Sequence, residues 1–288
     1  MKHRKIRPGS SSFTGDSSSS GSSQRVPEQE LSPYAYGPGL LLSDYGNSAV
    51  QELMRDSPES EAWDFYANAL TATDEDLRNQ ISSWRQSQEG NCATVAVSKA
   101  ATDAMGTRAF EEILPTPDGF KVTLRDGKEV ELSVEELEEA MAMSAFKGTN
   151  DAALSFGTLQ YAVTADQALE AGHEDAETYS DALGALNNGE SPNRVANFQG
   201  LQDDKVGISS NQLMPSGNTA AFGGKDSVVA WSRKHAVFAD KAKSGHTADH
   251  YGRGERYDGT DTNGAYRRRD RGNNIVKAFA FKTDDGER

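Results

Sequence analysis

Cys92 is the only cysteine in the chain, and the sequence places it at the start of a helix. Alanine and valine recur at helical spacing from Ala93 to Met105 without a proline, and Gly106 stands where a C-cap would end the helix. The unpaired N–H groups and the dipole at a helix N-terminus favour a thiolate over a thiol. The pattern therefore predicts a nucleophilic cysteine, with a small buried hydrophobe as the alternative.

A cysteine nucleophile needs a base that takes its proton, and His235 fits this role best. It begins the apolar run Ala236–Ala239, which predicts a buried strand. A histidine at the start of such a strand can be held in one tautomer, whereas a histidine in a polar loop cannot hold hydrogen-bond geometry. The other histidines lie in terminal or polar segments: His3, His173, His246 and His250.

The residues around the cysteine resemble those of the papain-like cysteine peptidases. Gln86 lies six residues before Cys92, and Gly90-Asn91-Cys92 is similar to the Gly-Asp-Cys of calpains. His235-Ala236-Val237 follows much later, as the histidine of that family does. Asp249-His250-Tyr251-Gly252 then resembles the family's Asn-x-Trp-Gly motif, with Asp for Asn and Tyr for Trp.

The resemblance implies an α+β chain with a papain-like two-lobed fold, in which a helical lobe carries the nucleophile helix and a second lobe is an antiparallel sheet. It implies that Cys92 is the nucleophile, and that Gln86 and the Cys92 N–H form the oxyanion hole. His235 would be the base and Asp249 the residue that orients it. Asp240 remains an alternative to Asp249, and Gln88 remains an alternative to Gln86.

The expected chemistry is acyl transfer through a thioester, without a cofactor or a metal. A protein or peptide substrate would lose a peptide bond to water, as in a peptidase. Deamidation or transamidation of protein glutamine is an alternative with the same residues. A second alternative is a non-catalytic interaction module or a bacterial effector or toxin-associated domain of the same fold.

Composition narrows the class of protein. The chain has 288 residues and a formal net charge of −14, and its mean hydropathy is −0.70. An acidic, polar chain is a poor candidate for nucleic-acid binding, and no apolar run approaches the roughly 20 residues of a membrane span. One cysteine excludes an intramolecular disulfide and a multi-cysteine zinc site. We expect a cytoplasmic protein, or one exported without a signal peptide, whose oligomeric state the sequence leaves open.

Composition also changes along the chain. Residues 1–30 are rich in serine and poor in apolar residues, which predicts a disordered tail. Residues 31–288 are expected to form the papain-like domain, with residues 31–190 mainly helical and residues 195–288 mainly strands.

Periodicity and turn signals divide the domain into elements. Helices are expected at 43–55, 61–70, 73–84, 133–146, 154–171 and 178–186. A hairpin is expected from strands 120–124 and 129–132, and further strands at 227–231, 235–239 and 274–281.

Two weaker signals lie near the C-terminal end. Residues 258–264 echo part of a calcium loop, but Gly259 falls where a first ligand should stand, so a turn is the expected structure. Arg267–Arg269 and Arg271 form a basic cluster that we expect to pair with nearby carboxylates.

Overall fold

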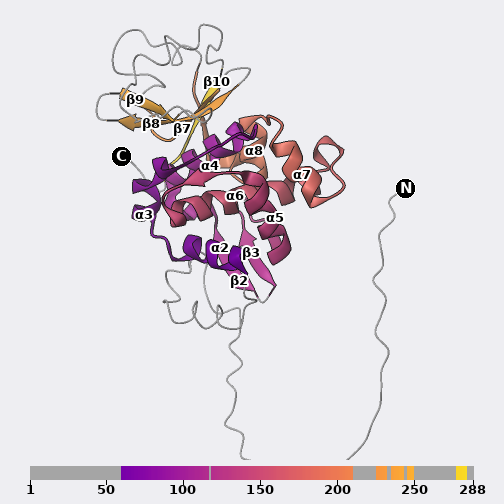
Figure 1. The fold of residues 1–288 in the computed structure, drawn as a ribbon. Coiled ribbons are helices and arrows are strands. Elements are labelled where there is room, and N and C mark those ends of the chain that lie inside the picture. Colours follow the sequence, from indigo (N-terminus) through magenta and orange to yellow (C-terminus); the bar gives the residue numbers. More distant parts are fainter. Residues whose placement is uncertain are drawn as a thin grey trace, which may run out of the picture. The chain divides into compact units, whose positions relative to one another are not determined.

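Helix α4, Cys92–Met105, lies between a β-sheet and a layer of helices (Figure 1). Twelve of its 14 residues are buried, so no side of the helix faces solvent along its length. A helix that is apolar all round belongs in the interior of a protein. Small residues predominate on α4, and they let neighbouring elements approach closely.

The computed structural model describes residues 60–116, 118–209, 225–231, 235–242, 245–249 and 277–283. The expected serine-rich tail, the expected helix at 43–55, the calcium-like loop and the arginine cluster lie outside these residues. The described part combines helices with antiparallel sheets, as the sequence predicts.

Within the described ranges, six α-helices accompany α4: α2 (Glu61–Thr71), α3 (Asp74–Asn79), α5 (Val134–Ser144), α6 (Asp151–Glu170), α7 (Tyr179–Leu186) and α8 (Pro192–Phe198). Four 3₁₀ turns connect them: η1 (Ile81–Ser83), η2 (Gly106–Ala109), η3 (His173–Asp175) and η4 (Gln202–Asp204). Hydrogen-bonded caps fix several starts. Thr73, Ser133 and Thr178 each form a capping box with the acidic residue three positions later, satisfying N–H groups that the helix leaves unpaired.

Three antiparallel sheets are present among the described residues. The largest has the order β6-β10-β7-β8-β9, and a second, β2-β3-β4, packs against the helices. The third pairs two short strands, β1 and β5. Their bounds are β1 (Trp84–Arg85), β2 (Glu112–Thr116), β3 (Gly119–Thr123), β4 (Glu129–Ser133), β5 (Lys147–Gly148), β6 (Lys205–Gly207), β7 (Val228–Trp231), β8 (Ala236–Ala242), β9 (Gly245–Asp249) and β10 (Lys277–Phe281).

Strands β7, β8 and β10 of the five-stranded sheet place apolar residues on both of its faces. Val229, Ala236 and Phe238 belong to the main core, which the helices share. Val228, Val237 and Ala239 alternate with them and form a second buried cluster. This alternation follows from the two-residue period of a strand, and it explains why these strands are apolar at nearly every position.

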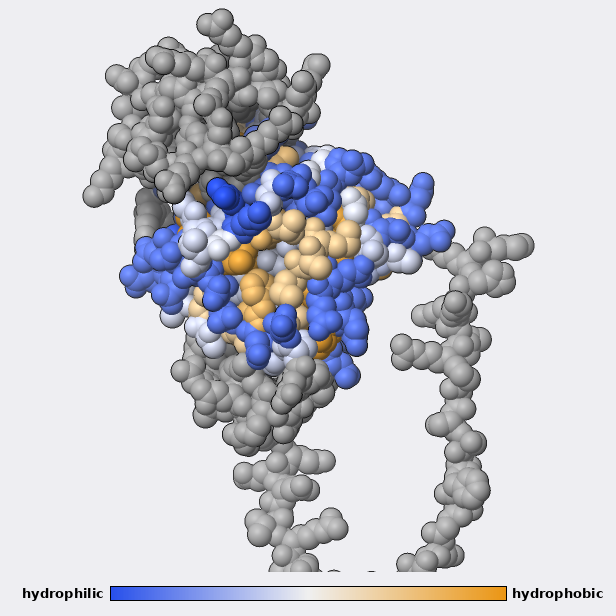
Figure 2. Space-filling view, in the orientation of Figure 1, coloured by the Kyte–Doolittle hydropathy of each residue, from blue (hydrophilic) through white to orange (hydrophobic). Residues whose placement is uncertain are grey.

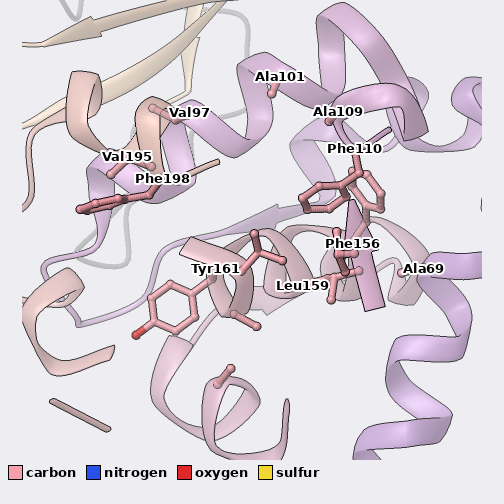
Figure 3. Close-up of a cluster of buried hydrophobic side chains, with 14 of the residues drawn as sticks. Ala69, Val97, Ala101, Ala109, Phe110, Phe156, Leu159, Tyr161, Val195 and Phe198 are labelled. Carbon is pink, nitrogen blue, oxygen red and sulfur yellow. The ribbon is translucent and has the colours of Figure 1, made fainter. Parts of the chain in front are cut away.

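The main core is built around α4, α6 and α8, and aromatic rings fill its widest parts (Figure 3). Phe110 and Phe156 pack edge to face with their ring centroids 5.8 Å apart. Val97 and Ala101 of α4 face this interior together with Val195 and Phe198 of α8. Figure 2 shows that hydrophilic residues surround an apolar area on one face of the described surface.

Several sequence-based boundaries were wrong for local reasons. The helix expected at 73–84 ends at Asn79, and Trp84 lies in β1. Strand β2 was not predicted, because its Pro115 disfavours a strand, yet it is an edge strand where proline is tolerated. Helix α8 begins in a segment expected to be a loop, and β9 lies in another. Strand β6 lies in the part expected to be mainly strands, although the sequence did not locate it.

Two helical glycines give matched tests of this packing. A Cβ at Gly157 of α6 would lie 2.5 Å from the Trp84 ring, whereas a Cβ at Gly184 of α7 would meet nothing within 4 Å. Gly157→Ala should lower the free energy of unfolding by about 1–3 kcal/mol through overpacking. Gly184→Ala should raise it by about 0.5–1 kcal/mol, because alanine favours the helix. Denaturant unfolding measures both, and equal effects would contradict the packing described for Trp84.

Candidate active site

Cys92 is the first residue of α4, and its side chain is half-buried against the main core. The backbone N–H groups of Ala236, Ala93 and Cys92 itself lie close enough to Sγ to favour the thiolate. Ala236 belongs to β8, and α4 packs directly on that strand. The start of the cysteine helix and the start of this distant strand therefore meet at the sulfur atom.

Burial raises the pKa of the Cys92 thiol above its ordinary value of 9.0, although the N–H groups of Ala236, Ala93 and Cys92 act in the opposite direction. The expectation that the helix N-terminus lowers this pKa is therefore corrected. Desolvation outweighs the backbone dipoles at this half-buried position. A thiolate here needs an additional positive group beside it.

His235 lies immediately before β8 and is half-buried. It is the direct neighbour of Ala236, whose N–H reaches the Cys92 sulfur. His235 is therefore the residue directly before the one whose N–H lies near the thiol.

Asp249 lies at the end of β9, so its expected place in a loop is corrected. Its backbone pairs with Phe238, three positions after His235, whereas the alternative Asp240 pairs with Thr247 further along the sheet. At about 3.3 Å per strand residue, Asp249 is about 10 Å from His235 along the strand and Asp240 about 17 Å. The register therefore brings Asp249 closer than Asp240.

Gln86 is buried with an exposed fraction of 7%, whereas the alternative Gln88 is exposed. The Nε2 of Gln86 donates a hydrogen bond to the carbonyl of Glu89, which leaves one of its two amide protons for another acceptor. Its Oε1 is buried without a hydrogen-bond partner among the described residues. Of the two glutamines, Gln86 is the one with a fixed side chain.

The loop between Gln86 and Cys92 is held by Asn187, a residue that the sequence analysis assigned to a loop and did not select. The N–H of Gly90 donates to the carbonyl of Asn187 at 2.9 Å. The side chain of Asn91 donates from Nδ2 to Asn187 Oδ1, also at 2.9 Å. Asn187 immediately follows helix α7, and its sequence signal was only that of a turn, Asn-Asn-Gly.

A hollow of about 610 Å³ lies beside this loop and opens to solvent. Glu89, Met143 and Asn187 line it, so it adjoins the residues that precede Cys92. Its other lining residues are mostly acidic or small, among them Glu174, Asp175, Asp181, Gly184 and Asn188.

His173 is not in a mobile polar loop as expected, but is buried in η3. Its Nε2 is 2.5 Å from Glu190 Oε2, and its Nδ1 is 3.2 Å from Nη1 of Arg194. Among the described residues, His173, Glu174 and Glu190 form a group with metal-ligand spacing. Arg194 also contacts Glu190 at 3.3 Å and supplies its countercharge, which favours an ion-pair network over a cation. His173 is thus engaged away from Cys92.

Sequence comparison adds no family to these observations. No family model matches the chain, and neither the curated proteins nor the solved structures include a match. Among the helices that the structure describes, none is long and apolar enough to cross a membrane.

Gln86→Met tests the description of this glutamine. The variant removes the hydrogen bond to Glu89 and also the unpartnered buried Oε1, and it keeps the volume of the side chain. Because the loss and the gain oppose one another, we expect a change in unfolding free energy of less than about 1 kcal/mol. Gln88→Met, at an exposed position, is the matched control in denaturant unfolding. A loss of several kcal/mol in Gln86→Met alone would show that Oε1 has a partner.

Proposed function

We propose that this chain is a cysteine-dependent acyl-transfer enzyme of papain-like architecture, and that it hydrolyses peptide bonds. Cys92 is the nucleophile and His235 the base. Asp249 orients His235, and Gln86 and the Cys92 N–H form the oxyanion hole. The packing of α4 on β8, which brings the Ala236 N–H close to Cys92 Sγ, carries the proposal, because it joins the cysteine helix to the strand that His235 precedes.

The electrostatics of the thiol support a pair rather than a lone nucleophile. Burial raises the pKa of Cys92, so the thiolate is costly unless a cation is adjacent. Protonated His235 supplies that cation, and the thiol proton is the one it takes up. The thiol with neutral His235 and the thiolate with protonated His235 are then close in energy. This is the condition for a reactive cysteine near neutral pH.

The reaction follows from these roles. The Cys92 sulfur attacks the substrate carbonyl, and its proton passes to His235. The tetrahedral oxyanion accepts hydrogen bonds from the remaining Gln86 Nε2 proton and the Cys92 N–H. His235 returns the proton to the leaving amine as the C–N bond breaks, which leaves a thioester. Water, deprotonated by His235, then cleaves the thioester and restores the thiol.

The second candidate is a non-catalytic module of the same fold. The raised pKa of Cys92 favours it, because a structural cysteine is half-buried and neutral in the same way. Deamidation and transamidation use the same first step and differ in the leaving group or in the acceptor, so they share the tests below.

The pH profile of Cys92 alkylation by iodoacetamide separates the two candidates. The enzyme should react well below pH 9, because the His235 cation stabilises the thiolate. In His235→Ala the raised pKa of the isolated thiol should move the reaction to more alkaline pH and lower the rate at pH 6.5 by at least about tenfold. His3→Ala serves as the matched histidine control. Identical profiles for the enzyme and His235→Ala would leave the non-catalytic module.

The role of Gln86 has its own test on a fluorogenic peptide substrate. Gln86→Met should lower kcat by about 10²–10³-fold with little change in KM, because the oxyanion forms in the transition state and the tetrahedral intermediate and not in the bound substrate. Gln88→Met, exposed in the same loop, should retain the kcat of the enzyme. Equal losses in both variants would exclude Gln86 as the oxyanion donor.

A further inference from the structure

We infer that Asn187 is a positioning residue that sets the segment Gly90–Cys92, and with it the reactivity of Cys92. The inference rests on the proposed function for its chemical consequence and on the hydrogen bonds of Asn187 for its geometry. No backbone contact between Asn187 and Cys92 is needed, because Asn91 and Gly90 transmit the constraint.

The contacts begin where two helices end. Helix α5 ends at Ser144 and helix α7 at Leu186, and the last carbonyl groups of a helix lack partners within it. Asn187 Nδ2 donates to the carbonyl of Met143 at 2.9 Å, and Asn91 Nδ2 donates to the carbonyl of Ser144 at 2.9 Å. The two asparagine side chains therefore satisfy the free end of α5 and join it to the cysteine loop.

The orientation of the Asn187 amide is fixed by its partners. Its Oδ1 accepts from Asn91 Nδ2 at 2.9 Å. The Tyr161 hydroxyl lies 3.0 Å from the same Oδ1 and shares its one proton between this oxygen and the Leu183 carbonyl. Burial raises the pKa of Tyr161, so its hydroxyl remains a donor at neutral pH. Asn187 Nδ2 donates to the Met143 carbonyl. A flipped amide would place its oxygen against this carbonyl and its N–H groups against the other donors.

The constraint continues along the backbone toward the sulfur. Asn91 is completely buried and is the residue before α4. Its position therefore fixes the position of the Cys92 N–H group that follows it. Gly90 approaches so closely that a Cβ would lie 2.5 Å from the Asn187 carbonyl oxygen. The loop is thus held by the side chain and the backbone of one residue.

A misplacement of this segment would separate the Cys92 N–H and Sγ from His235 and from Gln86. Displacements of about 1 Å from a change outside the reacting groups can cost on the order of 10²-fold in rate. Asn187 contributes no proton and touches no reacting atom in this scheme, so its effect is entirely positional.

Asn187→Ala tests the inference through two measurements on the folded protein. The first is the pH profile of Cys92 alkylation by iodoacetamide, in which the rate at pH 6.5 should fall about 10- to 100-fold. The second is amide hydrogen exchange across residues 88–93, which should become faster. Asn91→Ala combined with Asn187→Ala should lose less reactivity than the sum of the two single losses, because both single variants remove the Asn91–Asn187 hydrogen bond.

Two controls match the change without touching the loop. Asn68→Ala removes an asparagine that bonds only to carbonyls of its own helix. Tyr66→Phe removes a buried hydroxyl that donates to the Leu137 carbonyl at 3.1 Å, so it matches the loss of a buried hydrogen bond. Both should keep the alkylation profile of the parent protein even where they lower stability. If Asn187→Ala does not fold, Asn187→Asp replaces it, since it keeps the shape but cannot donate to Met143.

Each result has a defined meaning. An unchanged alkylation profile and unchanged exchange in Asn187→Ala would overturn the inference. Loss of reactivity that the controls share equally would also overturn it. If the parent protein shows no His235-dependent alkylation, the proposed enzyme function fails and amide exchange decides the positioning alone. Faster exchange at 88–93 would then uphold it, and unchanged exchange would overturn it.

Discussion

The packing of α4 against β8 on one side and α6 and α8 on the other is the interaction on which the described structure depends. The helix is buried along nearly its whole length, so each neighbouring layer must match its small side chains. Two of its polar side chains, Ser98 and Thr102, are paired across those layers. Ser98 accepts from Gln199 of the segment after α8, and Thr102 donates to Gln160 of α6. A shift of the helix along its axis would break these bonds, so packing and hydrogen bonding fix one position for Cys92.

Much of the architecture follows from periodicity and from caps. The capping boxes at Ser133 and Thr178 and the Asp126-Gly127 hairpin are local in sequence, and the structure contains all three. Strand β9 and helix α8 could not be found in this way. Helix α8 is seven residues long and begins in a segment rich in asparagine, glycine and proline, so packing against α4 and α6 decides its conformation. Strand β9 contains Gly245 and His246, and it pairs with β8 because that strand supplies the hydrogen-bonding edge.

Some features of the candidate site are likewise local in sequence, and others depend on the whole fold. Residue type and order led to Cys92, His235 and Gln86 as candidates, since each role demands a particular chemical group, and their roles stay predictions. The direction of the thiol pKa was predicted incorrectly, because the helix dipole is a local property and burial is a property of the whole fold. Asn187 was not found for a related reason. Its importance lies in contacts to Gly90, Asn91 and Met143, which no short sequence pattern connects.

The contact of the Ala236 N–H with Cys92 joins residues that half the chain separates. During synthesis, the helices up to α8 emerge before β8 has been made, and in that interval Cys92 stands at a helix end without this partner. Contacts of such large sequence separation also form late in folding, because closing the long intervening loop is costly in entropy. The order of synthesis therefore delays any chemistry that depends on both halves until the sheet has docked on α4.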